Sequence, residues 1–234
     1  MSGNRLLRST AVFSAMTFLS RVAGYLRDWL QASLFGTGPV SAFVVAYRIP
    51  NCLRRICAEG SFSAAFVPVL TELKQKGDDK AVQDFLDHVA GTLLAAVLVV
   101  SGLGMLLAPW IARLFLLFAG RDSELVLLTA QMLRITFPYL WFISMTALAA
   151  GVLNSYGRFG LPALTPVLHN LAMICAALFL APLMGMSITA MAWGVVAAGV
   201  VQMVAQWIAL ARLGVLPRLR LDLRHPGVRR VLRL

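Results

Sequence analysis

The sequence predicts an all-α, polytopic membrane protein, built as a lobe of six transmembrane helices. Hydrophobic residues make up 59% of the 234 residues and charged residues only 13%, whereas soluble domains carry about 45–50% and about 25%. The mean hydropathy is +0.80. Several uncharged runs also reach the roughly 20 residues that cross a bilayer as a helix. These observations exclude a water-soluble enzyme and a disordered chain.

Four of the six spans follow from long runs without charge. Residues 89–112 contain no charged side chain and predict a span over about 86–112. Residues 125–153 are interrupted only by Arg134 and predict another span. Residues 159–211 are uncharged throughout, which is too long for one helix, and a turn signal from Pro182 to Gly185 divides them. They therefore predict two spans, over about 159–180 and 188–211.

The first two spans, about 9–35 and 40–70, are unusual because they carry charge. The turn cluster Gly36-Thr37-Gly38-Pro39 separates them. Each charge at the centre of a lipid-facing helix costs about 2.5–3.5 kcal/mol on insertion scales. Both helices must therefore turn their charged side chains toward protein or water. The charged residues are Arg21, Arg27, Asp28, Arg48, Arg54, Arg55 and Glu59.

Basic residues sort to one side of the predicted bundle. With a cytoplasmic N-terminus, the cytoplasmic segments hold 13 basic residues and the opposite side holds only Arg113 and Arg121. This bias predicts that both termini are cytoplasmic. Residues 1–212 would form the six-helix domain, with a retained first helix rather than a cleaved leader, and 213–234 a basic cytoplasmic linker. Topology absorbs most of the net charge of +11, so no nucleic-acid partner is expected.

Polar residues of the first helix share one face. At about 100° per residue, Ser20, Arg21, Arg27 and Asp28 all fall within roughly 60° of Gly24. The remaining face is apolar. This pattern predicts a helix that lines a hydrated cavity.

The second helix carries a similar polar stripe. Its members are Arg48, Asn51, Arg55 and Glu59. Arg55 and Glu59 are spaced for an i,i+4 ion pair, whereas Arg54 points about 100° away from the stripe. Pro50 and Gly60 are candidates for bending this helix.

The predicted spans contain more positive than negative charge. They hold six arginines, Arg134 included, but only two acids. One interpretation is a structural network in which arginines pair with Asp28 and Glu59. The other is an anion-binding cavity, which the surplus favours because ionisable residues inside membranes are functional by default. The planar arginine fork suits phosphate oxygens. The predicted ligand is therefore a phosphate- or pyrophosphate-bearing molecule, and a lipid-linked one fits best.

Other candidate sites carry little signal. His88 is interpreted as a solvated interfacial residue, and His169, beside Asn170, as a packing histidine. The three cysteines are scattered through apolar surroundings without zinc or disulfide spacing. We find no nucleophile–base pair, metal motif or phosphate-binding glycine loop. The sequence therefore predicts no enzyme activity, no metal and no cofactor.

Several motifs resemble those of the MurJ (MviN) family, the lipid II flippases of bacterial peptidoglycan synthesis. The segment SRVAGYLRD at residues 20–28 is similar to the family's first-helix motif. The segment PNCLRRICAEGSFSAAFVP at residues 50–68 is similar to its PNLLRRIFAEGAFSQAFVP signature. The segments ITFPY at 135–139 and LNSYGRFGLPALTPVLHN at 153–170 also match its pattern. The resemblance extends over essentially the whole chain.

The resemblance implies a transporter of the multidrug/oligosaccharidyl-lipid/polysaccharide (MOP) exporter superfamily in the bacterial inner membrane. Such proteins have two six-helix lobes around a cationic cavity, where arginines meet the pyrophosphate of lipid II. Alternating access then moves the headgroup to the periplasmic side. By motif position, the implied cavity arginines are Arg21, Arg27 and Arg54, and the supporting polar residues are Ser20, Asp28 and Glu59, with Arg55 as the partner of Glu59. The implied partners are lipid II, membrane lipids and a second lobe.

Two features depart from the family pattern. Ser41 stands where members commonly have an aspartate, so no acid is present there for gating or ion coupling. The sequence also ends where the family would enter its seventh helix. We therefore expect the N-terminal half of a transporter, followed by a linker to a missing second lobe.

Two rival functions stay open at this stage. An antiporter of the same superfamily that exports organic cations would need surplus acid in the spans, where this sequence has surplus arginine. A non-transporting membrane scaffold would use basic residues 218–234 as an interfacial helix against anionic lipid or a cytoplasmic partner.

Overall fold

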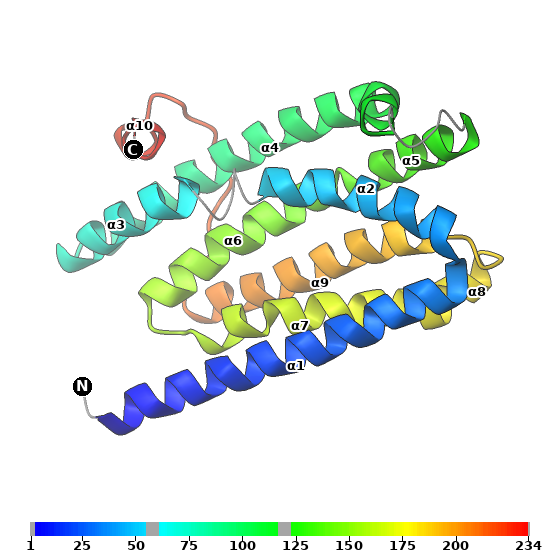
Figure 1. Cartoon of the computed structure of the whole chain (residues 1–234). Coiled ribbons are helices and arrows are strands. Elements are labelled where there is room, and N and C mark those ends of the chain that lie inside the picture. The colour runs from blue at the N-terminus through cyan, green and yellow to red at the C-terminus, as the bar shows by residue number, and fades with distance from the viewer. Residues whose placement is uncertain (1–2, 55–60, 117–122, 234) are drawn as a thin grey trace.

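Helices make up the secondary structure of this computed structural model, which describes residues 3–54, 61–116 and 123–233, and the side chains of 14–53, 64–116 and 123–231 (Figure 1). No strand occurs within those ranges, as the predicted all-α class requires. The helices are α1 (Gly3–Phe35), α2 (Thr37–Arg54), α3 (Ser61–Gln75), α4 (Asp79–Phe115), α5 (Ser123–Thr136), α6 (Tyr139–Ser155), α7 (Gly160–Cys175), α8 (Ala181–Leu183), α9 (Thr189–Arg212) and α10 (Pro226–Arg233). A π-helical turn (Ala176–Leu180) joins α7 to α8.

Four helical segments are long and apolar enough to cross a membrane. They are Asp79–Phe115, Ser123–Ser155, Gly160–Leu183 and Thr189–Arg212. They coincide with the four uncharged runs and confirm the predicted membrane class. Within the described ranges, the charged first part of the chain adds no segment of this kind, so the total of six spans stays a prediction.

Two of the predicted spans are each divided between two helices. The span over 125–153 consists of α5 and α6, because Pro138 has no N–H with which to continue the helical hydrogen bonds. The span over 40–70 consists of α2, which ends at Arg54, and α3, which begins at Ser61. The residues between them lie outside the described ranges.

Pro50 lies inside α2, where its missing N–H leaves the Ala46 carbonyl without its usual helical donor. The Thr136 hydroxyl, at the end of α5, donates to that carbonyl at 3.1 Å and lies 3.3 Å from a second acceptor, the Leu133 carbonyl of its own helix. Ala46 and Thr136 are both fully buried. The contact between α2 and α5 thus supplies the hydrogen bond that the proline removes.

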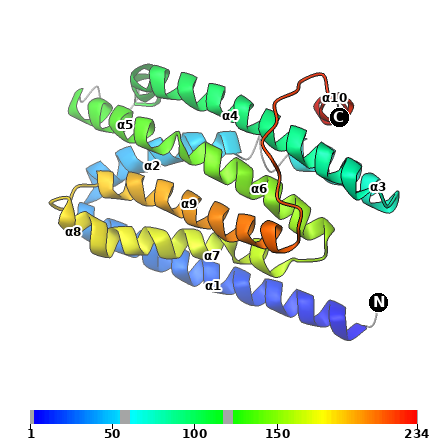
Figure 2. The ribbon, with the colours of Figure 1, turned by 180° about the vertical axis from the view of Figure 1, so that it is seen from behind.

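The helices pack side by side along their lengths. α1 packs on α7, α7 on α9, and α9 on α6, while α4 packs on α5 and α6 (Figures 1 and 2). Aromatic side chains fill the core beside α4: the rings of Phe66 and Phe85 stack 5.6 Å apart and both are about 1% exposed. The candidate site lies elsewhere in the bundle, where α1 packs on α7.

Several connections between helices that carry basic residues lie at the same end of the bundle. The N-terminus, the α3–α4 turn, the α6–α7 turn and the C-terminal end of α9 lie at one end of the bundle (Figure 1). The α1–α2 turn and α8 lie at the opposite end. The basic residues at the first end are Lys74, Lys76, Lys80, Arg158 and Arg212. This arrangement agrees with the charge bias behind the predicted orientation, although the cytoplasmic side itself stays a prediction.

Residues 213–233, here called the tail, are docked on the bundle rather than extended away from it. The tail runs from the end of α9 across α4 to α10 (Figure 2). α10 packs on α3 and α4, and its Val228 and Val231 are buried. Arg230 of α10 pairs with Glu72 of α3 at 2.7 Å.

Candidate functional site

α1 turns part of its polar face toward the protein and an apolar face outward, while Arg21 and Asp28 are exposed. Gln31 is buried and Ser20 and Arg27 are half-buried, whereas Phe18 and Tyr25 are 71% and 76% exposed. This is the reverse of an amphipathic helix on a soluble protein, and an apolar outer face suits contact with lipid. Of the face that the sequence pattern predicted as cavity-lining, Ser20, Gly24 and Arg27 therefore pack toward α7, whereas Arg21 and Asp28 are exposed.

Arg27 connects α1 to α7 through Asn170. Its Nη1 donates to Asn170 Oδ1 at 2.8 Å, and its Nε and Nη2 donate to Asp28 Oδ1 at 2.9 and 2.7 Å. Asn170 Nδ2 donates to the Ser20 carbonyl at 2.8 Å, and because a carbonyl only accepts, Asn170 Oδ1 must face Arg27. A guanidinium has five N–H groups, so these three bonds leave about two for a ligand.

Two adjoining hollows lie beside α1. Arg27 lines the first, of about 500 Å³, and Arg21 lines the second, of about 380 Å³. The first lies between α1, α2, α3, α6, α7 and α9, and the second between α1, α6 and α7. Asn154, Pro162 and Pro166 belong to the walls of both. We refer to the two hollows together as the arginine cavity.

Positive charge dominates the arginine cavity. Its ionisable lining residues within the described part of the chain include Arg21, Arg27 and His169, and no carboxylate lines it there. Arg27 shares its charge with Asp28, whose side chain is 65% exposed and lies outside the lining. Arg21 forms no ion pair with any residue that the structure describes. The cavity can therefore accept an anion without first breaking an ion pair at Arg21.

Sequence reasoning missed most of the neutral wall of the cavity. Gln202 and Gln206, one turn apart on α9, donate their Nε2 atoms to the carbonyl and the hydroxyl of Thr165 at 3.0 and 2.7 Å. Their i,i+4 spacing in an uncharged run was the available signal. His169 fits its predicted packing role, because its ring stacks on that of Tyr47 at 5.7 Å and its Nε2 lies 3.2 Å from the Tyr47 hydroxyl.

The remaining predicted residues fall in different places. Asn51 lines the arginine cavity, whereas Arg48 and Arg134 are exposed and do not line it. Gly24 faces Asn170 across the α1–α7 contact, where a Cβ would lie 3.5 Å from Asn170 Nδ2, an ordinary van der Waals distance. The Arg54 side chain and the residues Arg55, Glu59 and Gly60 lie outside what the structure describes, so their roles stay predictions.

Known proteins are similar to the chain along most of its length. A family model described as "Lipid II flippase MurJ" matches residues 31–234. A "Lipid II flippase MurJ" from Burkholderia cenocepacia is 44% identical over 97% of this chain and 45% of its own length. A "Probable lipid II flippase MurJ" from Haemophilus influenzae is 41% identical over 94% of this chain and 44% of its own. A solved structure, "Lipid II flippase MurJ, inward closed conformation", superposes with a TM-score of 0.76 at 27% identity, over 95% of this chain and 46% of that one. The chain thus spans about half the length of the curated relatives it matches.

Proposed function

The chain belongs to the lipid II flippase MurJ family, and on this premise we propose that it acts as the N-terminal lobe of a lipid II transporter. The lobe would sit in the bacterial inner membrane with both termini in the cytoplasm. Together with a second lobe, it would move lipid II from the cytoplasmic to the periplasmic leaflet by alternating access.

The excess of positive charge in the arginine cavity carries this proposal. Arg21 and Arg27 would bind the pyrophosphate of lipid II through charge-assisted hydrogen bonds, to which a guanidinium fork is well matched. Arg54 joins them by its motif position. Asp28 already holds two N–H groups of Arg27 and competes with the ligand for them. This competition limits the affinity for the pyrophosphate and so makes its release easier.

The same charge disfavours the rival functions. An organic cation would enter a cavity whose described lining carries arginines and no carboxylate. A scaffold with no ligand would have no need to hold the half-buried Arg27 inward on a helix whose opposite face is exposed and apolar.

Binding of lipid II to the purified chain, followed by native mass spectrometry in detergent, tests the proposal. The cavity variant combines Arg21→Ala and Arg27→Ala. The control combines Arg48→Ala and Arg134→Ala, which removes the same charge from exposed positions outside the cavity. We expect selective lipid II adducts, relative to phosphatidylglycerol, in the parent and the control but not in the cavity variant. Equal adducts in both variants would contradict the assignment of the cavity.

Growth rescue tests transport itself. In an intact two-lobe version of the transporter, Arg27→Ala or Arg54→Ala should abolish rescue of cells depleted of their own flippase while membrane insertion persists. Arg48→Ala should rescue normally. Normal flipping by both cavity mutants would overturn the role of these arginines.

Asn170 should act as a positioning residue for Arg27. Hydrogen bonds to charged groups contribute about 1.5–3 kcal/mol. Asn170→Leu removes the bond that holds Arg27 Nη1 and should weaken lipid II binding about tenfold, less than loss of both arginines. Titration of lipid II adducts measures this, and unchanged affinity would show that the amide does not position the guanidinium.

A further inference from the structure

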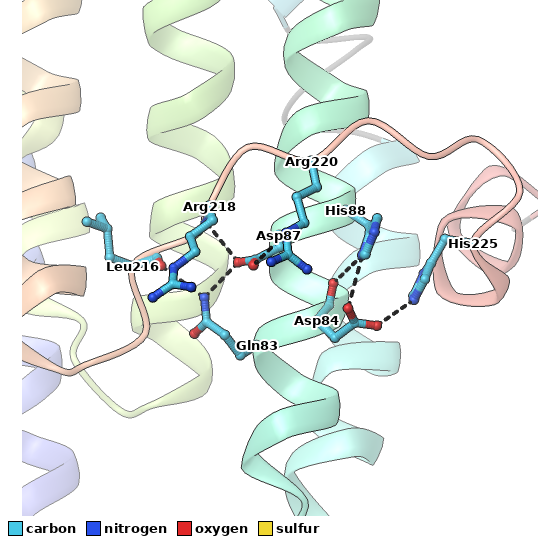
Figure 3. A network of polar contacts seen from close by, with 8 residues as sticks. All are labelled: Gln83, Asp84, Asp87, His88, Leu216, Arg218, Arg220 and His225. Atoms are coloured by element: carbon cyan, nitrogen blue, oxygen red, sulfur yellow. Dashed lines mark hydrogen bonds and ion pairs between the residues drawn. The ribbon is translucent and has the colours of Figure 1, made fainter.

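The tail is anchored to α4 by contacts that involve no histidine. The buried Asp87 accepts the Arg218 backbone N–H at 2.7 Å, and its own carbonyl accepts the Arg220 N–H at 3.1 Å. Gln83 donates to the Leu216 carbonyl at 2.9 Å (Figure 3). These bonds place the next part of the tail beside the first turns of α4.

Three side chains converge there from two distant parts of the chain. Asp84 and His88 lie one turn apart on α4, and His225 approaches from the tail (Figure 3). Asp84 Oδ2 lies 3.0 Å from His225 Nε2. His88 Nδ1 donates to the Asp84 backbone carbonyl at 2.8 Å and lies 3.4 Å from Asp84 Oδ1. The two imidazole rings stack with centroids 4.4 Å apart. One ligand atom from each residue lies within 4.8 Å of the other two.

We propose that Asp84, His88 and His225 form a binding site for a divalent transition-metal ion, with Zn²⁺ the best fit. Imidazole nitrogen and carboxylate oxygen are ligands that zinc accepts at about 2.0–2.2 Å. Two nitrogens and one oxygen favour zinc, nickel or copper over magnesium and calcium, which prefer oxygen ligands. Three protein ligands leave the fourth tetrahedral position to water, and Asp84, whose side chain is 49% exposed, gives the ion a way in.

Metal binding at this site would displace protons from the ligands without any other chemical change. Both imidazoles must be neutral and Asp84 ionised, so a proton that His225 shares with the Asp84 carboxylate is released to solvent. His88 Nδ1 donates to the Asp84 backbone carbonyl, so His88 binds the ion either through Nε2 or through Nδ1 after a change of tautomer. The carboxylate then neutralises one of the two positive charges of the ion. The metal would fasten the tail to Asp84 and His88 of α4, in addition to the contacts of the tail with Asp87 of α4 and Glu72 of α3. This inference does not depend on the proposed transport of lipid II.

No sequence motif predicts this site, because its third ligand, His225, comes from a separate segment of the chain. Asp84 and His88 form an i,i+4 pair, a spacing that places both on one helix face. His225 is brought to them only by the docking of the tail, across 141 positions from Asp84. Sequence reasoning accordingly interpreted His88 as interfacial and predicted no metal.

Metal titration of the purified 234-residue chain in detergent tests the site. Zn²⁺ binding is measured by calorimetry and Co²⁺ binding by its visible absorption, in a cysteine-free background that removes competing thiolates. The ligand variants are Asp84→Asn, His88→Gln and His225→Gln. The matched control is Asp222→Asn, in the same tail, whose carboxylate contacts the Arg224 N–H instead of the cluster.

We expect one ion per chain and at least about tenfold weaker binding in each ligand variant, because loss of even an outer-shell partner costs 10–100-fold. The control should bind as the parent does. Zn²⁺ should also slow tryptic cleavage after Arg224 in the parent but not in His225→Gln, a readout that does not rely on affinity. Absence of binding in the parent, or equal affinities in ligand variants and control, would overturn the proposal.

Discussion

Replacing Thr136 with valine should show how much the hydrogen bond that compensates for Pro50 in α2 contributes to the free energy of unfolding. The Thr136 hydroxyl lies 3.1 Å from the Ala46 carbonyl, to which Pro50 has no N–H to donate. Valine keeps the shape of threonine but cannot donate, so a fully buried carbonyl would lose this bond. Hydrogen bonds between membrane helices contribute about 0.6 kcal/mol on average and up to about 1.7, and an unsatisfied buried group costs about 1–3 kcal/mol. We expect a loss of about 1–2 kcal/mol, which is a 5- to 30-fold change in the unfolding equilibrium.

A second substitution makes this prediction specific. Pro50→Ala restores a backbone N–H that can donate to the Ala46 carbonyl. The free-energy cost of Thr136→Val should therefore be about 1 kcal/mol smaller in the Pro50→Ala background than in the parent. Reversible unfolding in mixed detergent micelles measures all four free energies of the cycle. Thr146→Val is the control, because its hydroxyl donates to Phe142 within its own helix and its effect should be the same in both backgrounds. An equal cost of Thr136→Val with and without Pro50 would refute the reasoning.

Two further predictions concern the tail. Gly91→Ala should detach the tail from α4, because a Cβ at residue 91 would overlap the backbone of Arg220 in the tail. Tryptic cleavage of the tail should then become severalfold faster. Gly102→Ala is the control and should leave the cleavage rate unchanged, because there is open space around Gly102. Hydrogen bonds from Lys76 and Arg230 lower the pKa of Glu72 from its usual 4.5 to about 2. The contribution of this depressed carboxyl to stability is therefore fully present above about pH 4.5 and is lost as the pH falls through about 2. A carbon-13 NMR titration of Glu72 should show this, and Arg230→Gln should raise the pKa; a titration near 4.5 in the parent would contradict the contact.

Local patterns were enough to predict four membrane-spanning segments and part of one polar face. Absence of charge over 89–112 and 159–211 predicted spans that the structure contains, because burying charge in lipid is costly whatever the neighbours are. The helical period alone placed Ser20 and Arg27 on the face of α1 that packs on α7, but it grouped with them Arg21 and Asp28, which are exposed. The division at Pro138 was missed because hydropathy carries no signal from one absent N–H.

Contacts between distant segments were decided by the tertiary structure. Arg27 meets Asn170 across 143 positions, and Asp84 meets His225 across 141. Neither pair follows from composition, spacing or charge, because each depends on which helices lie side by side and on where the tail docks. By itself, the sequence determined which residues lie in helices, which segments suit lipid and which side of α1 is polar. The tertiary structure decided the partners of those polar groups, because hydrogen bonds and ion pairs act over a few ångströms in space, whatever the separation along the chain.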